Sequence, residues 1–314
     1  MRYIKDLQEN ERIIDHYLCR KKESRESRVG KTFLSLKLQD KTGTVDAKVW
    51  ELSSDIGPFE EGDVIKVDAL VGSYQNELQV KILKLRRSSE GEYKISDYIP
   101  TTEKDIGKMY ARVKELIDSV STPCIKALLE NIIVTDSTRA EMFRSHSAAM
   151  HMHHGYRGGL LEHTLSVTEI ALFLGERYKY INMDILLAGA LLHDIGKIYE
   201  LSPLPQNMYT DDGQMLGHII LAVEMISAEI AKIKGFPHEL ASLIKHCIIS
   251  HHGEYEFGSP KLPSTPEAML LHFADNVDAK LTTFGELIDN DATPGLWTTY
   301  QKSLGRYVRK PGKA

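Results

Sequence analysis

Cysteine is scarce in this sequence, and long apolar runs are missing. The three cysteines, Cys19, Cys124 and Cys247, form no CxxC pair, which excludes a disulfide scaffold and a zinc finger built on thiolates. No apolar stretch approaches the roughly 20 residues that a helix needs to cross a bilayer. The first residues also lack the apolar centre of a secretory signal. We therefore expect a cytoplasmic protein with no membrane partner.

Neither sign of charge dominates. The 39 basic and 44 acidic residues give a net charge of -5, which excludes a polycation that binds nucleic acid along its whole length. At 314 residues the chain is long enough for two domains. Twelve of its 13 histidines follow residue 100 and lie on an acidic background. A mixed histidine and carboxylate metal site requires such a concentration.

The first hundred residues alternate between apolar and polar positions, which is typical of β-strands. Leu34, Leu36 and Leu38 show this alternation most clearly. The expected strands cover 13–19, 32–39, 45–50, 64–71 and 78–82. Five strands in about 80 residues is the strand count of an OB barrel. We therefore predict an OB-like β-barrel over residues 1–92, followed by a linker and helices over 93–145.

OB barrels hold single-stranded nucleic acid on aromatic platforms beside a basic groove, and both features have candidates here. The aromatic candidates are Phe33, Trp50 and Tyr74. The basic ones, expected in the loop after the first strand, are Arg20, Lys21, Lys22, Arg25, Arg28 and Lys31. The alternative is that the rings fill the barrel and that the loop is merely solvated.

From about residue 104 the apolar residues recur at three and four positions, which is the spacing of α-helices. Met109, Val113 and Leu116 begin this pattern, and no strand-like alternation interrupts it. We expect Gly196 to end one helix and Pro266 to open the last. The later helices are expected over 160–178, 184–194, 215–234, 238–250 and 266–290. The predicted fold class is multidomain α+β, with an all-α domain over 146–314 behind the barrel.

One set of histidines and carboxylates stands out in the helical region. Its members are His163, His193, Asp194, His218, His251, His252 and Asp275. Imidazole with carboxylate suits Mn²⁺, Fe²⁺, Zn²⁺ or Ni²⁺, and no thiolate is at hand to select a softer ion. Asp194 follows His193 at the end of an apolar helix, where so polar a pair needs a partner such as a metal ion. A carboxylate can also bridge two cations about 3.5–4 Å apart.

The order of these residues resembles a known family. His163, His193-Asp194 and Asp275 resemble the HD-domain metal-dependent phosphohydrolases, and the further histidines resemble the members that hold two metals. The stretches 158–164, 193–197 and 251–253, with a barrel ahead of them, are similar to the YhaM family. This resemblance implies a 3′→5′ exoribonuclease, usually dependent on Mn²⁺, whose barrel binds nucleic acid. Water attack at the terminal phosphodiester would release nucleoside 5′-monophosphates.

The resemblance also implies a role for each residue. The ligands of the first metal would be His163, His193, Asp194 and Asp275. Asp194 would bridge to a second metal held by His218 and His251, with His252 either a ligand or a group that orients one. Lys197 would face a substrate phosphate, and the alternative is that it complements a helix end. Fe²⁺, Ni²⁺ and Co²⁺ are alternatives to Mn²⁺.

Several alternatives stay open at this point. His154 and Arg157 precede the first ligand and are candidates for guiding RNA, with a plain surface loop as the alternative. The Gly-Tyr-Pro signature of cyclic-dinucleotide phosphodiesterases is missing after His252. The competing functions are an HD-type phosphohydrolase of nucleotides or cyclic dinucleotides, and a non-catalytic single-strand nucleic-acid-binding protein. Single-stranded DNA is an alternative substrate. The apolar C-terminal helices and the tail over 296–308 offer surface that a partner subunit could cover, which leaves a homo-oligomer open.

Overall fold

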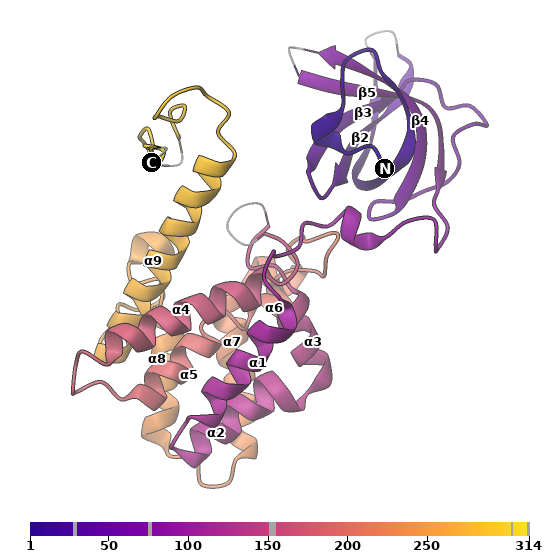
Figure 1. Ribbon diagram of the computed structural model, residues 1–314. Helices are drawn as coiled ribbons and strands as arrows, with labels where there is room; N and C mark the ends of the chain where they lie inside the picture. The colour runs from indigo at the N-terminus through magenta and orange to yellow at the C-terminus, as the bar shows by residue number, and fades with distance from the viewer. Residues whose placement is uncertain (28–29, 75–76, 151–154, 303, 313–314) are drawn as a thin grey trace. The chain divides into compact units, whose positions relative to one another are not determined.

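The N-terminal residues form a closed β-barrel (Figure 1). The computed structural model describes residues 1–27, 30–74, 77–150, 155–302 and 304–312. Its strands are β1 (Arg12–Glu26), β2 (Thr32–Asp40), β3 (Gly43–Val49), β4 (Val64–Tyr74) and β5 (Glu77–Arg87), in the order β1-β2-β3-β5-β4 around the barrel. β3 and β5 pair in parallel, and the other neighbours are antiparallel. The five-stranded OB-like barrel is therefore confirmed.

The barrel interior is filled by the alternating apolar residues that predict it. Leu36 and Leu38 of β2 are buried, as are Val67 and Ala69 of β4. Tyr17 of β1 is buried too, and its hydroxyl donates to the carbonyl oxygen of Arg2 at 2.7 Å. Short 3-10 helices at Ile4–Asp6 and Ile95–Asp97 flank the strands along the chain.

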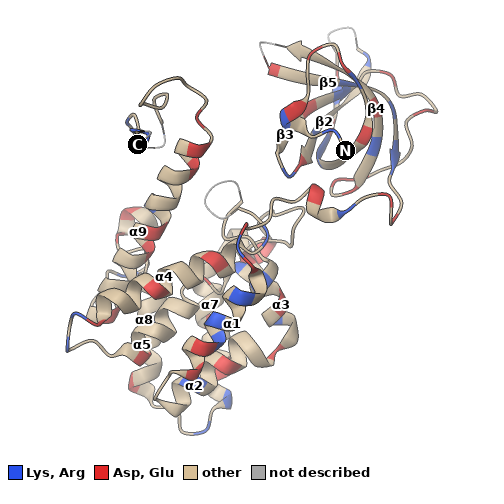
Figure 2. Ribbon diagram, in the orientation of Figure 1, with Lys and Arg blue, Asp and Glu red and all other residues tan. Residues whose placement is uncertain are grey.

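The prediction for the end of β1 is wrong, and most of the basic residues expected in a loop lie in this strand instead. Beyond a bulge between Cys19 and Lys21, β1 continues along β2 to Glu26. Arg20, Lys21, Lys22 and Arg25 therefore lie in a strand, Lys31 lies just before β2, and Arg28 is outside the described residues. Both faces of this extension are partly exposed, so no apolar alternation marks it in the sequence. Acidic residues are interspersed with the basic ones over the barrel (Figure 2), and Glu23 pairs with both Lys21 and Arg25.

The remainder of the chain is helical, as predicted. Its helices are α1 (Ile106–Asp118), α2 (Pro123–Leu129), α3 (Ser137–Ser145), α4 (Gly159–Gly175), α5 (Met183–Leu192), α6 (Lys197–Glu200), α7 (Asp211–Lys232), α8 (His238–Ser250) and α9 (Pro266–Asp289). A π-helical turn at Glu130–Thr135 joins α2 to α3, and a 3-10 helix covers Tyr255–Phe257. By its contacts the chain divides into Met1–Thr101 with Pro203–Asn207, and Thr102–Ser202 with Met208–Ala314.

α5 is the central helix of the second unit. All its residues from Ile185 to Leu192 are buried, and it packs against α4, α8 and α9. The side chain of Asn182 caps its start by accepting from the amides of Asp184 and Ile185. α9 opens similarly, with Pro266 in its first turn and the Thr265 hydroxyl accepting from the amide of Ala268. The caps fix where the two helices begin, and α5 in turn positions His193 and Asp194, which follow its last residue.

Gly196 does not end a helix, contrary to the prediction. α5 ends at Leu192, a turn follows over 193–196, and α6 begins at Lys197. Gly196 has φ of -63°, which any residue adopts, so its backbone conformation does not require glycine. The requirement comes instead from a neighbouring helix. A Cβ atom at Gly196 would lie 2.0 Å from the carbonyl oxygen of His218, a contact too short for any other residue.

α7 is the one described helix that is long and apolar enough to cross a membrane by length and composition. It is interrupted, however, at Gly217, whose φ of 73° and ψ of 162° are not helical. It also packs against α6 and α8, and its residues Ala222 and Ile226 are fully buried in the helical core. α7 is therefore a kinked core helix, and its kink immediately precedes His218.

Candidate metal centre

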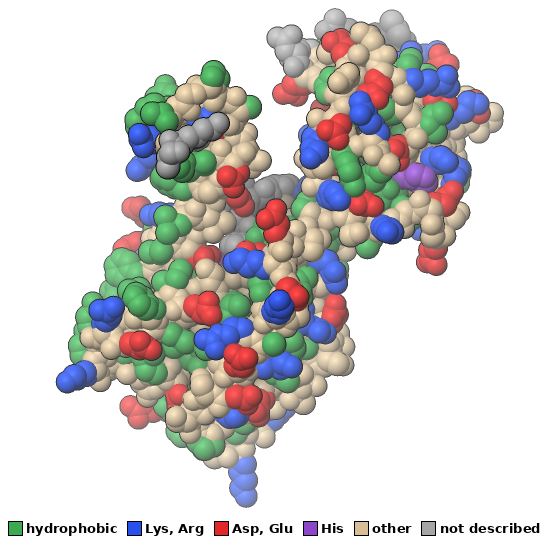
Figure 3. All heavy atoms as spheres, in the orientation of Figure 1, with side chains coloured by type: hydrophobic (Ala, Val, Ile, Leu, Met, Phe, Trp, Pro, Cys, Tyr) green, Lys and Arg blue, Asp and Glu red, His purple; other side chains and the backbone are tan. Residues whose placement is uncertain are grey.

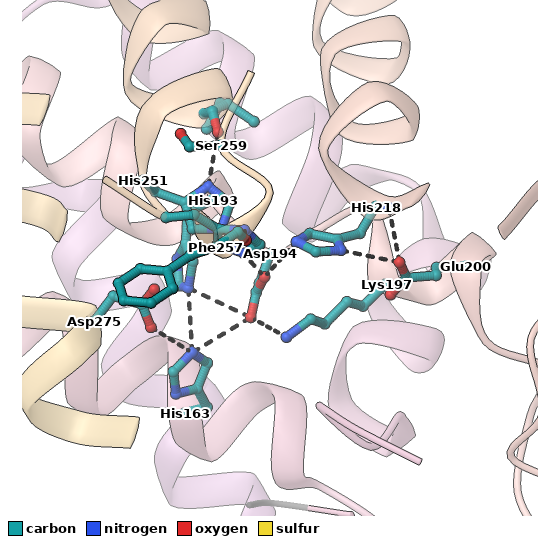
Figure 4. A network of polar contacts seen from close by, with 12 residues as sticks. His163, His193, Asp194, Lys197, Glu200, His218, His251, Phe257, Ser259 and Asp275 are labelled. Carbon is teal, nitrogen blue, oxygen red and sulfur yellow. Dashed lines mark hydrogen bonds and ion pairs between the residues drawn. The ribbon is translucent and has the colours of Figure 1, made fainter. Parts of the chain in front are cut away.

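Five segments of the helical unit bring the predicted ligands together (Figure 4). His163 lies on α4, His193 and Asp194 follow α5, His218 lies on α7, His251 and His252 follow α8, and Asp275 lies on α9. Two groups have ligand atoms that all lie within 4.8 Å of one another: His163, His193 and Asp194 form one, and His218, His251 and His252 the other. Asp275 joins the first group through its Oδ1, which lies 3.3 Å from Nε2 of His163, so all seven residues meet in one place.

Five imidazoles in this centre are held in the same way, by an oxygen atom next to Nδ1. The acceptors are Asp278 for His163 at 2.7 Å, Ala190 O for His193 at 2.8 Å, Glu200 for His218 at 3.0 Å, Ile248 O for His251 at 2.7 Å and Phe257 O for His252 at 2.9 Å. Because carbonyl and carboxylate oxygens only accept, each Nδ1 carries a hydrogen. In the neutral ring, Nε2 then has the lone pair that a metal ion requires.

The two oxygens of Asp194 face different histidines. Oδ2 lies 3.3 Å from Nε2 of His163 and 3.4 Å from Nε2 of His193. Oδ1 lies 3.5 Å from Nε2 of His218 and 3.8 Å from Nε2 of His251. The carboxylate therefore stands between two groups of nitrogen donors, which is the position of a bridging ligand between two cations.

The donor atoms fit a cation chemically. Nε2 of His218 is buried and makes no hydrogen bond to any residue that the structure describes. Nε2 of His163 lies 3.2 Å from Nε2 of His193, so two lone pairs would face each other unfavourably if both rings were neutral and no cation were bound. Burial lowers the pKa of His163, but hydrogen bonds with Asp194, Asp275 and Asp278 outweigh it and raise that pKa well above its ordinary value. The position therefore favours a positive charge.

The acidic members of the centre are ionised. Burial raises the pKa of Asp194, but Lys197 and the neighbouring imidazoles hold it well below its ordinary value. Burial likewise opposes ionisation of Asp275, and His163 and His193 lower its pKa by more. Buried anionic carboxylates next to imidazole lone pairs are the donor set of hard and borderline divalent cations.

Lys197 reaches into the centre from the start of α6. Its Nζ lies 2.6 Å from Oδ2 of Asp194, and its side chain is 18% exposed. Burial lowers the pKa of Lys197, and the charge of Asp194 more than offsets this, so the amine stays protonated. A cavity of about 230 Å³ surrounds these groups and is lined by His163, Asp194, Lys197, His251, His252 and Asp275 with small alanines.

Glycine at position 196 allows the second group of histidines to reach Asp194. The missing Cβ atom lets α7 approach until the carbonyl oxygen of His218 and the amide of Ala222 lie against Gly196. Gly213, near the start of α7, allows a similar approach, because a Cβ atom there would lie 2.1 Å from the carbonyl oxygen of Glu200. α6 and α7 are therefore packed backbone to backbone beside the metal ligands.

Two carboxylates next to the ligands are absent from the predicted set. Asp278 accepts from Nδ1 of His163 and from the hydroxyl of Ser166, and it is buried. Glu200 accepts from both the amide and Nδ1 of His218. Spacing places Asp278 on the same helix face as Asp275, three residues away, but it does not reveal the contact with His163. These carboxylates fix the ring orientation of their histidines.

The predicted nucleic-acid contacts have surroundings of their own. Arg157 is exposed and has Glu141 as its ion-pair partner at 3.9 Å, while His154 is outside the described residues. On the barrel, Phe33 stacks on Trp50 with ring centroids 4.6 Å apart. Trp50 is 42% exposed and Tyr74 62%. The alternative that these two rings fill the barrel is therefore wrong.

Comparisons with known proteins match both units. Residues 160–280 match the HD domain, and residues 19–87 match an OB-fold nucleic acid binding domain. The 3′-5′ exoribonuclease YhaM of Geobacillus sp. (strain WCH70) is 35% identical over 271 residues, which are 86% of this chain and 82% of that protein. The YhaM protein of Bacillus subtilis (strain 168) is 32% identical over 288 residues, which are 91% of this chain and 90% of that protein. The similarity thus extends over most of the chain.

Proposed function

This chain belongs to the family of the 3′-5′ exoribonuclease YhaM, and on this premise we propose that it hydrolyses single-stranded RNA from the 3′ end to nucleoside 5′-monophosphates. One observation carries the proposal. The carboxylate of Asp194 stands between two groups of imidazoles whose Nε2 atoms face it. Phosphodiester hydrolysis at neutral pH is the chemistry for which such paired sites are suited.

We propose two divalent cations, with Mn²⁺ ahead of Fe²⁺, Ni²⁺ and Co²⁺. The first would be held by His163, His193, Asp194 and Asp275, and the second by Asp194, His218, His251 and His252. When bound, such cations lower the pKa of water from about 15.7 towards 7 and neutralise the charge that develops on the phosphate. The donor set supports this because it joins imidazole with carboxylate and contains no thiolate among the described residues.

Residues of the chain would orient the metal ligands and stabilise charge on the phosphate. Asp278 and Glu200 keep two of the imidazoles in the orientation and tautomer for binding. Lys197 supplies a fixed positive charge beside Asp194, and we assign it to a non-bridging oxygen of the scissile phosphate. His193, Asp194 and His251 are buried, which strengthens the electrostatic interactions that they make.

We propose that the barrel holds the RNA strand. The exposed rings of Trp50 and Tyr74, and Phe33 stacked on Trp50, offer sequence-tolerant platforms for bases. Lys48, whose Nζ lies 5.7 Å from the Phe33 ring centroid, adds positive charge at the same place. We assign RNA as the substrate ahead of single-stranded DNA because the relatives are named exoribonucleases. The cytoplasm, where the cysteines stay reduced, is the proposed location.

We also propose that the chain pairs with a second copy through α9. Met269, Phe273, Val277 and Leu281 are exposed at four-residue spacing along this helix. Hydrophobic side chains gather on this side of the helical unit in Figure 3. A second copy brings the same stripe, so the two can bury each other about a two-fold axis. Light scattering should then show a dimer that Leu281→Lys dissociates, and a wild-type monomer would contradict the proposal.

The activity is tested by a time course on 5′-labelled single-stranded RNA with Mn²⁺ or with EDTA. We expect progressive shortening that requires Mn²⁺ and is lost in Asp194→Asn. Asp212→Asn, which changes an exposed carboxylate on α7, serves as the matched control and should keep full activity. Intact RNA that is retarded on a gel would instead indicate a binding protein. Hydrolysis of free nucleotides or cyclic dinucleotides with intact RNA would indicate the other phosphohydrolase class.

A further inference from the structure

A second cavity adjoins the metal centre. It has a volume of about 220 Å³ and shares His252 with the cavity around Asp194. His218, from the second group of candidate ligands, lines it as well. Its apolar lining consists of Leu216, Ile219, Ile220, Phe257 and Pro260. A molecule bound at the metal centre can therefore extend into an apolar space beside His252.

Phe257 is an exposed ring on a firmly held loop. The side chain is 58% exposed. Its backbone is fixed on both sides, because its amide donates to Glu254 O at 3.1 Å and its carbonyl accepts from Nδ1 of His252 at 2.9 Å. The next amide, of Gly258, donates to Tyr255 O at 3.0 Å. The loop thus presents an apolar ring to the cavity at little cost in conformational entropy on binding.

The two cavities differ in charge. Lys197 and the carboxylates of Asp194 and Asp275 line the first. The described residues that line the second include no lysine or arginine, and they include Glu200. A strand that continued through the second cavity would bring a further phosphate to this carboxylate. The 3′-terminal nucleotide has no further phosphate, so it is the portion of an RNA chain that suits this space.

We propose that the second cavity receives the base of the 3′-terminal nucleotide, which stacks on Phe257 while its 5′-phosphate lies at the metal centre. This assignment rests on the proposed exoribonuclease activity and adds the subsite that positions the chain end. Stacking tolerates every base, because each base has a π-face. It also supplies a reason for cleavage at the terminus, since the cavity accommodates a nucleotide that ends the chain.

The experiment compares RNA with an intact 3′-terminal nucleotide and RNA whose terminal nucleotide lacks its base. For wild type we expect KM to be on the order of tenfold higher with the abasic end, the magnitude of one stacked base. Phe257→Ala should raise KM by about the same factor on intact RNA and leave the abasic substrate unchanged. Phe257→Trp should retain the preference, because it keeps a stacking face.

The matched control is Phe173→Ala, which removes a ring that is 60% exposed on α4 and lines neither cavity. It should leave both substrates unchanged. Equal losses on both substrates in Phe257→Ala would show that the ring only shapes the loop and would overturn the proposal. A preference that depends on the penultimate base, or no effect of the substitution, would overturn it as well.

Product binding separates failure of this inference from failure of the proposed function. In calorimetry with Mn²⁺ present, wild type should bind AMP about tenfold more tightly than ribose 5-phosphate, and Phe257→Ala should bind the two alike. If wild-type protein left RNA intact but kept this difference, the exoribonuclease proposal alone would fail. If it shortened RNA and showed no difference, the base subsite alone would fail.

Discussion

Asp278 provides the sharpest test of how the metal ligands are held. It is buried, 7% exposed, and its Oδ2 lies 2.7 Å from Nδ1 of His163. Asp278→Asn keeps the volume and an oxygen that can accept from Nδ1, but it removes the negative charge that makes Nε2 more basic. Ser166, which donates to Asp278, can rotate to accept from the new amide. The fold should therefore survive.

The expected size of the effect follows from the contact. Loss of a carboxylate that orients a metal-binding histidine costs about 10- to 100-fold in metal affinity or activity, or about 1.4 to 2.8 kcal/mol. Because His163 itself stays in place, the loss should be in affinity. The activation curve of RNA shortening against Mn²⁺ concentration should shift by that factor, and the rate at saturating Mn²⁺ should approach that of wild type.

The assay is RNA shortening over a Mn²⁺ series, with Mn²⁺ affinity measured separately by calorimetry. Asp289→Asn is the matched control, since Asp289 is an exposed carboxylate at the end of the same helix. It should leave the activation curve in place. An activation curve for Asp278→Asn that coincides with wild type would show that Asp278 does not hold His163 for metal binding. A rate that stays low at saturating Mn²⁺ would contradict this role too, because it would place Asp278 in the chemistry itself.

Three further substitutions test the packing of α6 and α7, the aromatic platform of the barrel and the role of Lys197. Gly196→Ala should lower the free energy of unfolding of the metal-free protein in urea by about 1–3 kcal/mol or more, because backbone atoms occupy the space that the new Cβ needs. Gly285→Ala, where nothing lies within 4 Å of the new Cβ, should be neutral or stabilising, and equal effects of the two substitutions would contradict the close packing at Gly196. Trp50→Ala should weaken the binding of single-stranded RNA, measured by fluorescence anisotropy, by about 1–3 kcal/mol. Leu52 is similarly exposed, and Leu52→Ala should leave binding unchanged. Unchanged binding in Trp50→Ala would show that Trp50 does not contact the RNA. Lys197→Met should lower kcat by about 10²–10³ with metal content retained, and an unchanged kcat would exclude a phosphate contact.

The predicted elements of the fold are those whose signal is local. Alternation in β2 and helical spacing in α8 depend on neighbouring residues, and both elements lie within one residue of the prediction. The extension of β1 beyond Cys19 is held by pairing with β2 and buries little apolar surface, so its own sequence carries no alternation. The π-helical turn at Glu130–Thr135 likewise has no periodic pattern of its own.

The same distinction between local signals and distant contacts applies to the site residues. The seven predicted ligand residues can be named from their types and order, and the structure brings them together. Asp278 could not be assigned, because its role depends on His163, 115 residues away in the chain. The sequence likewise predicts Gly196 as a helix stop, because the contact that requires glycine comes from the backbone of His218, which is distant in the chain. Spatial partners far apart in sequence leave no local pattern.

The position of Asp194 between two cation sites can be observed by anomalous diffraction at the manganese edge from crystals soaked in MnCl₂. We expect two peaks, one beside His163 and His193 and one beside His218 and His251, about 3.5–4 Å apart with Asp194 between them. A single peak, or peaks that do not contact Asp194, would contradict this position of Asp194.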